Sequence, residues 1–203
     1  MITELANLKQ ELISISQSTN LGFNITPATK EQIETLAASL EPLNPTAEPT
    51  NHIELIQGRW RLLYSTFNLE QETTLQRLSF GKLPDVKVNV TGIFQEIYLD
   101  GQQYINLIEF TGVSGVQGVG LVRGRYTVED EKRLNIEFVE TSVKSANNDL
   151  SDAAFREALG VDNDSPLEAT LSFSGWSDIT YLDENFRLMR GNQQNLYVLL
   201  RDE

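Results

Sequence analysis

The chain has 203 residues, of which 29 are acidic and 16 basic, giving a net charge of −13 and a pI of about 4.5. This length suits one domain with its own core plus an extension, and the acidic surface argues against nucleic acid and anionic lipid headgroups as partners. The absence of cysteine and the single histidine, His52, exclude disulfides, thiolate nucleophiles and cysteine or histidine metal clusters. We therefore predict no metal site, no cofactor and no catalytic residues.

The N-terminal segment predicts a helix over residues 2–16, because apolar residues recur there at helical spacing. Its acidic residues Glu4 and Glu11 are not typical of a secretory signal or a transit peptide. No apolar run approaches membrane-spanning length. The sequence therefore predicts a cytoplasmic protein without signal peptide, transit peptide or transmembrane segment.

A second helix is predicted after Thr26-Pro27, which reads as an N-cap followed by proline in the first turn. Its apolar face consists of Ile33, Leu36, Ala37 and Leu40. Three prolines between residues 41 and 50 then predict a stiff linker. We divide the chain into an N-terminal helical extension and linker, residues 1–50, and a barrel domain, residues 51–203.

The rest of the chain is dominated by alternating patterns typical of strands. A buried strand is predicted over 58–67, followed by a short helix near 73–78. Asp100-Gly101 predicts a two-residue hairpin turn between strands 93–99 and 103–110. Glycines in 112–120 match neither a dinucleotide nor a phosphate-loop fingerprint, so a bulged strand connection is expected. Further elements are predicted as strands 121–128 and 133–139, a helix over 151–159, and strands 167–173, 177–182, 186–190 and 196–201.

Short connections and no crossover helices predict an antiparallel barrel of about eight strands. A sandwich with a filled core fits the same periodicity. Gly124 is predicted to leave room inside the barrel, so that Gly124→Leu would narrow a cavity. The aromatic residues expected to face inward and line a ligand pocket are Trp60, Tyr64, Phe110, Tyr126, Phe138 and Phe173; Trp60 has the simpler alternative of plugging one end of the core.

Two motifs at the ends of the barrel carry a resemblance. Leu55-Ile56-Gln57-Gly58-Arg59-Trp60-Arg61-Leu62-Leu63-Tyr64-Ser65-Thr66 resembles the opening motif of the plastid lipid-associated protein (PAP/fibrillin) family. Tyr181-Leu182-Asp183-Glu184-Asn185-Phe186-Arg187-Leu188-Met189-Arg190-Gly191, followed by Asn195-Leu196-Tyr197-Val198-Leu199, resembles the closing one. Gly58 and Trp60 in the first, with Asp183, Arg187 and Arg190 in the second, are assigned to a barrel-closing motif.

The resemblance implies a lipocalin-like (calycin) barrel of a cyanobacterial-type member. It also implies a non-enzymatic carrier for a hydrophobic small molecule, such as a carotenoid, prenylquinone or other lipid, in peripheral contact with the thylakoid membrane. Arg187 and Arg190 are an odd number of residues apart, so only one can point inward, where it would stack on Trp60. Two alternatives remain: a protein that coats lipid bodies or thylakoids without an internal ligand, and a barrel enzyme similar to bilin lyases.

Overall fold

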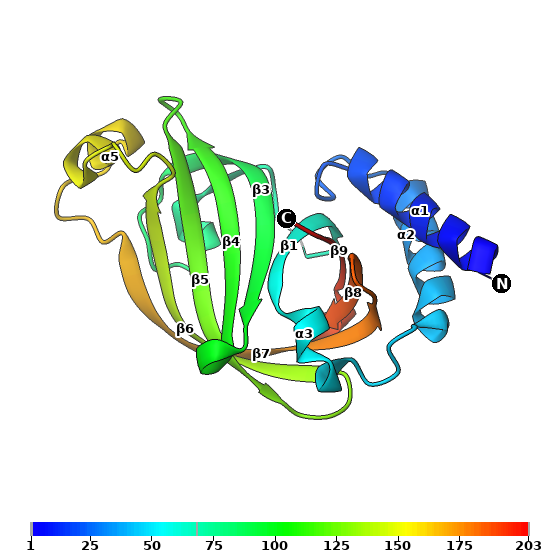
Figure 1. Ribbon diagram of the computed structural model, residues 1–203. Helices are drawn as coiled ribbons and strands as arrows, with labels where there is room; N and C mark the ends of the chain where they lie inside the picture. Colours follow the sequence, from blue (N-terminus) through cyan, green and yellow to red (C-terminus); the bar gives the residue numbers. More distant parts are fainter. Residues whose placement is uncertain (1, 68, 203) are drawn as a thin grey trace.

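The computed structural model describes residues 2–67 and 69–202 (Figure 1). In chain order the helices are α1 (Ile2–Ser18), α2 (Pro27–Leu40), α3 (Ile53–Ile56), α4 (Leu75–Leu78) and α5 (Asp152–Leu159). The strands are β1 (Gly58–Ser65), β2 (Glu72–Thr74), β3 (Lys87–Tyr98), β4 (Gln103–Gly112), β5 (Gln117–Val128), β6 (Arg133–Ser145), β7 (Glu168–Leu182), β8 (Phe186–Gly191) and β9 (Leu196–Arg201). Short 3₁₀ segments lie at η1 (Glu41–Leu43), η2 (Pro49–Asn51), η3 (Asp100–Gln102) and η4 (Asn192–Gln194).

The strands form one antiparallel sheet that closes into a barrel, which confirms the predicted fold class. Their order is β1-β9-β8-β7-β6-β5-β4-β3-β2, and pairing of β1 with β3 closes the ring, leaving β2 as an addition to β3. A single closed sheet also rules out the sandwich alternative.

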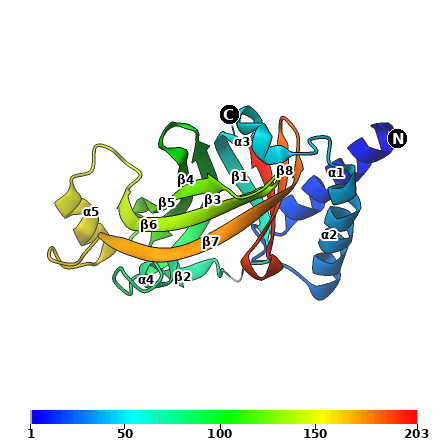
Figure 2. The ribbon, with the colours of Figure 1, turned by 90° about the horizontal axis from the view of Figure 1, so that it is seen from below.

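The barrel is closed at one end only. β3 to β7 are long, whereas β1, β8 and β9 are short. β1 pairs with β3 only between Gly58 and Arg61, and β8 meets β7 only from Ser177 onward. The first half of β7 therefore continues past the short strands, as Figure 2 shows. We call the end that carries Trp60 the closed end, and the end with α4 and α5 the open end.

Helices α1 and α2 pack side by side on the outside of the barrel, beside β8 and β9 (Figures 1 and 2). Thr26 caps α2 by accepting the Thr29 backbone N–H at 3.1 Å, as the sequence predicts. Both helices share one apolar cluster with the outer faces of β1, β8 and β9. The division at residue 50 remains a prediction. Within residues 2–67 and 69–202, no helix has the length and apolar character needed to cross a membrane.

Several local predictions differ from the structure. β3 begins at Lys87 rather than at residue 93, and β5 begins at Gln117, inside the glycine-containing segment predicted as a connection. The β3–β4 turn spans residues 99–102 rather than two residues, because Tyr98 and Gln103 are the last pair of the ladder; Gly101 and Gln102 in this turn have positive φ. Strands predicted at 167–173 and 177–182 are one continuous strand, β7, whose Gly175 lies against the Phe138 ring. β6 continues to Ser145, well beyond the predicted end at residue 139.

Candidate functional site

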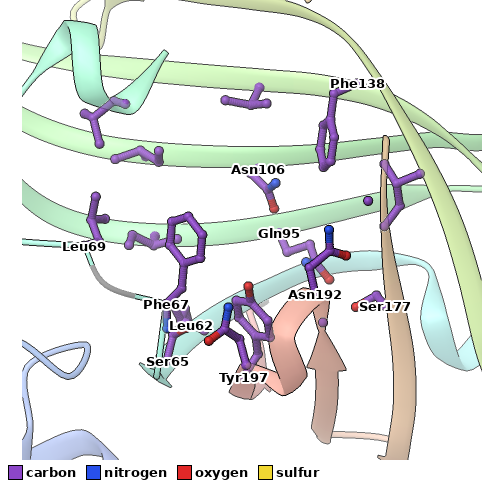
Figure 3. A pocket seen from close by; sticks show the side chains of 18 of the residues that line it. Leu62, Ser65, Phe67, Leu69, Gln95, Asn106, Phe138, Ser177, Asn192 and Tyr197 are labelled. Carbon is purple, nitrogen blue, oxygen red and sulfur yellow. Dashed lines mark hydrogen bonds between the residues drawn. The ribbon is translucent and has the colours of Figure 1, made fainter. Parts of the chain in front are cut away.

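A cavity of about 330 Å³ lies inside the barrel and reaches the surface at the open end, at a mouth between β7, α4 and the segment after β1 (Figure 3). Most of its wall is apolar. The residues that line it include Leu62, Phe67, Leu69, Arg77, Phe80, Ile93, Gln95, Asn106, Val122, Phe138, Phe173, Ser177 and Tyr197.

Aromatic side chains form one wall and the mouth. Phe138 and Phe173 stack with ring centroids 4.9 Å apart, and Phe80 packs against Phe173 at 4.6 Å. Phe80 is 50% exposed and Phe67 52% exposed, although both line the cavity. Together they give the mouth an apolar surface that is continuous with the interior of the cavity.

The inner end of the cavity is polar. Gln95 accepts a hydrogen bond from the Arg187 guanidinium and donates one to the Tyr104 hydroxyl. Burial raises the pKa of Tyr104 well above its usual value, so the phenol stays protonated. Asn106 and Tyr197 complete this end from opposite walls (Figure 3).

The closed end is filled by a stack around Trp60. The Arg187 and Arg201 guanidinium carbons lie 4.4 Å and 4.3 Å from the Trp60 ring. The indole Nε1–H donates to the Ile56 carbonyl at 2.8 Å, and Arg187 reaches the same oxygen at 3.5 Å. Arg187 is thus the inward arginine, stacked on Trp60 as the sequence predicts.

Arg187 is a fully buried cation, and burial lowers its pKa to about 9. It therefore remains charged at neutral pH. Its Nε has no hydrogen-bond partner among the described residues. The ring faces of Trp60 and the oxygens of Gln95 and Ile56 are what stabilise this charge.

The other motif residues organise the same region from outside. Gly58 begins β1 with φ +111°, a conformation that favours glycine. Asp183 accepts the backbone N–H groups of Asn185 and Phe186 at 2.9 Å and 2.8 Å, and so fixes the β7–β8 turn. Arg190 faces outward, where it donates to carboxylates on α2 and η1 at 2.9 Å each.

Of the six aromatic residues predicted to line a pocket, the structure places only Phe138 and Phe173 in the wall of the cavity. Trp60 and Tyr126 belong to the packed closed-end core. Phe110 belongs to the open-end core, where its ring lies directly over Gly118.

Tyr64 points out of the barrel, and its predicted inward orientation is wrong. A register shift between Leu62 and Tyr64 changes which face each side chain takes. Tyr64 consequently packs in the cluster shared with α1 and α2.

The prediction that Gly124 leaves room in the cavity is also wrong, because Gly124 is not part of the cavity wall. A Cβ at this position would lie 2.7 Å from the Glu137 carbonyl oxygen, at a register shift between β5 and β6. Gly124→Leu would therefore disturb the barrel rather than narrow the cavity.

Sequence reasoning missed the residues that distinguish this cavity. Asn106 lies in a row of β4 whose other inward members, Tyr104, Ile108 and Phe110, are buried. A polar residue in an otherwise buried row was the available signal. Phe67 and Phe80 gave no such signal, because their place at the mouth depends on how the chain returns between β1 and β3.

Residues in left-handed backbone conformations gather around the mouth. Leu21 and Phe80, which line the cavity, have φ of 63° and 56°. Gln193 and Gln194, both with φ 60°, lie in η4 between the lining residues Asn192 and Asn195. Such conformations cost about 1–3 kcal/mol each and cluster at functional sites.

Comparison with known proteins agrees with this architecture. The sequence model of the PAP_fibrillin family matches residues 6–200. The chain belongs to the PAP_fibrillin family. Similar proteins include a plastid-lipid-associated protein of Citrus unshiu, 26% identical with 99% of this chain and 69% of the relative covered. A chromoplast-specific carotenoid-associated protein of Cucumis sativus is 26% identical, with 98% of this chain and 69% of the relative covered.

A probable plastid-lipid-associated protein of Arabidopsis thaliana is 25% identical, with 99% of this chain and 72% of the relative covered. No solved structure matches the chain. Membership of the PAP_fibrillin family and the names of these relatives associate the chain with lipids.

Proposed function

We propose that this protein binds one hydrophobic small molecule in the barrel cavity, as a carrier without a catalytic step. The observation that carries the proposal is the 330 Å³ cavity, apolar over most of its wall and open to the surface. This volume lies at the lower end of the range of about 300–1,000 Å³ for small-molecule sites. Relatives named for lipids and carotenoids support the same ligand class.

An isoprenoid, carotenoid, prenylquinone or other lipid suits such a wall. Burial of about 400 Å² of apolar ligand surface would contribute about 10 kcal/mol. Association and ordering cost several kcal/mol of this, which leaves an expected dissociation constant in the micromolar range.

Filling the cavity with a side chain tests the proposal. Val122 lines the cavity and is buried on β5, so Val122→Phe places a ring in the empty volume. We expect saturable binding of a quinone or carotenoid analogue, measured by isothermal titration, to be lost while the melting temperature holds or rises. Val128→Phe, on the same strand but 51% exposed, is the matched control and should bind as the parent does. Unchanged binding in Val122→Phe would refute an internal site.

Extraction of the protein from its host, followed by mass spectrometry of co-purifying lipids and pigments, identifies the natural ligand. A protein that carries no apolar molecule and binds none by titration would contradict the proposal.

Contact with a lipid surface is a second candidate function, which the half-exposed Phe67 and Phe80 favour. In that case the mouth would rest peripherally on the thylakoid membrane or on a lipid body. Co-sedimentation with neutral lipid vesicles should fall in Phe67→Ser/Phe80→Ser and persist in Val113→Ser, whose side chain is 82% exposed on the β4–β5 turn. Equal sedimentation of both variants would exclude the mouth as the contact surface.

A further inference from the structure

We propose that the inner end of the cavity is a binding site for one oxygen atom of the ligand. The ligand enters head first, a hydroxyl or carbonyl oxygen binds between Asn106 and Tyr197, and the hydrocarbon chain leaves through the mouth. This inference rests on the proposed function and specifies the class of ligand: a long apolar chain that ends in an uncharged oxygen.

The first observation that supports this oxygen site is the position of the Asn106 side chain. Its amide projects from β4 into the cavity, in line with the buried side chains of Tyr104 and Ile108 (Figure 3). The structure gives this amide no hydrogen bond to any other described residue. This amide faces the cavity without a partner among these residues, so a ligand oxygen that accepts from its N–H would add a hydrogen bond that the protein alone does not make.

The second observation is the position of the Tyr197 hydroxyl. The Tyr197 ring is held in place by close approach to Gly191, where a Cβ would lie 2.9 Å from the ring carbon Cε2. Burial raises its pKa to about 12, so the hydroxyl remains a donor at neutral pH. Among the described residues it too has no hydrogen-bond partner, and Figure 3 shows it directed inward from the wall opposite Asn106.

Gln95 lies beside them but is already committed. Its oxygen accepts from Arg187 and its amide nitrogen donates to Tyr104, which fixes its orientation. The nearby Ser177 is likewise engaged, by a hydrogen bond with Tyr104, so at this end Asn106 and Tyr197 are the polar groups to which the described residues give no partner. The buried charge of Arg187 behind Gln95 makes this end favourable for the partial negative charge of an oxygen.

The charged residues around the cavity argue against a ligand whose polar end is ionised. Among the described residues that line the cavity, Arg77 is the one charged side chain. It is half-exposed, and its guanidinium pairs with the Glu70 carboxylate at 2.6 Å. A carboxylate or phosphate at the inner end would have no direct ionic partner there.

The shape of the cavity sets the orientation in which the ligand binds. Asn106 and the Tyr197 hydroxyl lie at the inner end, whereas Phe67, Leu69 and Phe80 line the mouth beside the ion-paired Arg77. A volume of 330 Å³ is small for a long isoprenoid chain, so the part that does not fit must extend past the exposed aromatic rings at the mouth.

Matched ligands test the proposal. Farnesol and farnesene share a 15-carbon branched chain; farnesene lacks the terminal hydroxyl and has one further double bond in its place. We would titrate both into the parent, Tyr197→Phe and Asn106→Leu, and compare the ratio of the farnesene to the farnesol dissociation constant. This comparison cancels the difference in the water solubility of the two ligands. Tyr197→Phe removes only the hydroxyl, and leucine is the apolar side chain closest in shape to asparagine.

Each variant should lower this ratio about 3- to 10-fold, because each removes one hydrogen bond to farnesol alone. Tyr98→Phe, an exposed tyrosine of β3 outside the cavity, is the control and should leave the ratio unchanged. Farnesyl diphosphate should bind at least 10-fold more weakly than farnesol to the parent.

The outcomes separate this inference from the proposed function. Saturable binding of both ligands with an unchanged ratio in the variants, or with equal weakening of both, would overturn the oxygen site and leave the apolar cavity intact. Farnesyl diphosphate binding as tightly as farnesol would overturn the uncharged class. Absence of binding by either farnesol or farnesene would refute the proposed function and this inference with it. If Asn106→Leu fails to fold by circular dichroism, Tyr197→Phe decides the test alone.

Discussion

Replacing Trp60 by alanine tests whether the closed end determines the stability of the barrel. The side chain is fully buried, donates a hydrogen bond to the Ile56 carbonyl and makes cation–π contacts with two guanidinium groups. Trp60→Ala removes all three interactions at once. It also leaves the charge of Arg187 beside an empty volume.

The expected loss follows from these parts. A buried Trp→Ala change costs about 3–5 kcal/mol through lost transfer free energy and the remaining cavity. Each cation–π contact adds about 0.5–2 kcal/mol, the larger value applying to the desolvated Arg187. We therefore expect the free energy of unfolding to fall by about 6 kcal/mol, a large share of the 5–15 kcal/mol typical of a domain. For a chain of this size the melting temperature would fall by about 15 °C.

Urea unfolding followed by circular dichroism measures this loss, and Trp176→Ala is the matched control. The Trp176 ring also lies beneath an arginine, Arg133 at 4.3 Å, but its residue is only partly buried. We expect the control to lose about 1–2 kcal/mol. Equal losses in the two variants would show that neither burial nor the paired guanidinium groups distinguish Trp60, and would refute the reasoning.

Three further predictions concern other parts of the barrel. Gly118→Ala should destabilise the protein by about 1–3 kcal/mol, because its Cβ would lie 2.3 Å from the Phe110 ring. Gly120→Ala, whose Cβ would have no atom nearer than 3.8 Å, should not destabilise it, and thermal melts compare the two variants. The free energy of unfolding should fall as pH rises from about 10 to 12, because the pKa of Tyr197 is about 12 in the folded state and about 10 in the unfolded state. Over this range the folded state retains a proton that the unfolded state loses. Urea unfolding across this range should show a shallower fall in Tyr197→Phe than in the parent. Arg190→Met should speed amide hydrogen exchange in α2 but not in β6, because its two ion pairs attach α2 and η1 to β8; equal exchange in parent and variant would contradict this role.

The fold was predictable because its signals are local. Strand alternation, hairpin turns and helix caps each depend on a few adjacent residues, and together they indicated an antiparallel barrel. Strand alternation also predicted that Arg187 and Arg190 point to opposite faces. In the structure Arg187 stacks on Trp60, and Arg190 pairs with a carboxylate of α2. Ser151 and Gly160 likewise mark the two ends of α5.

The cavity wall was not predictable in the same way. Which aromatic residues reach it depends on register shifts in several strand pairs, and each shift moves the following side chains to the other face. Tyr64 shows this directly. An inward orientation is also not sufficient: Phe138 lines the cavity, whereas Tyr126 packs into the core around Trp60, although its partner Ile136 on β6 lines the cavity.

Non-glycine residues with left-handed backbone occur at both ends of this barrel: Gln102 lies in the β3–β4 turn at the closed end, and several others lie near the mouth. The closed end is fully packed around Trp60, whereas the mouth holds residues such as Leu21, Phe80 and Gln193 in left-handed conformations. Strained backbone persists only when the surrounding structure compensates for it. Strands β3 to β7 run through both regions, so burial at the closed end can hold the mouth in an open shape that local preference would not maintain. Stability and ligand access are then properties of different residues, and substitutions at Trp60 and at the mouth residue Phe80 should alter them separately.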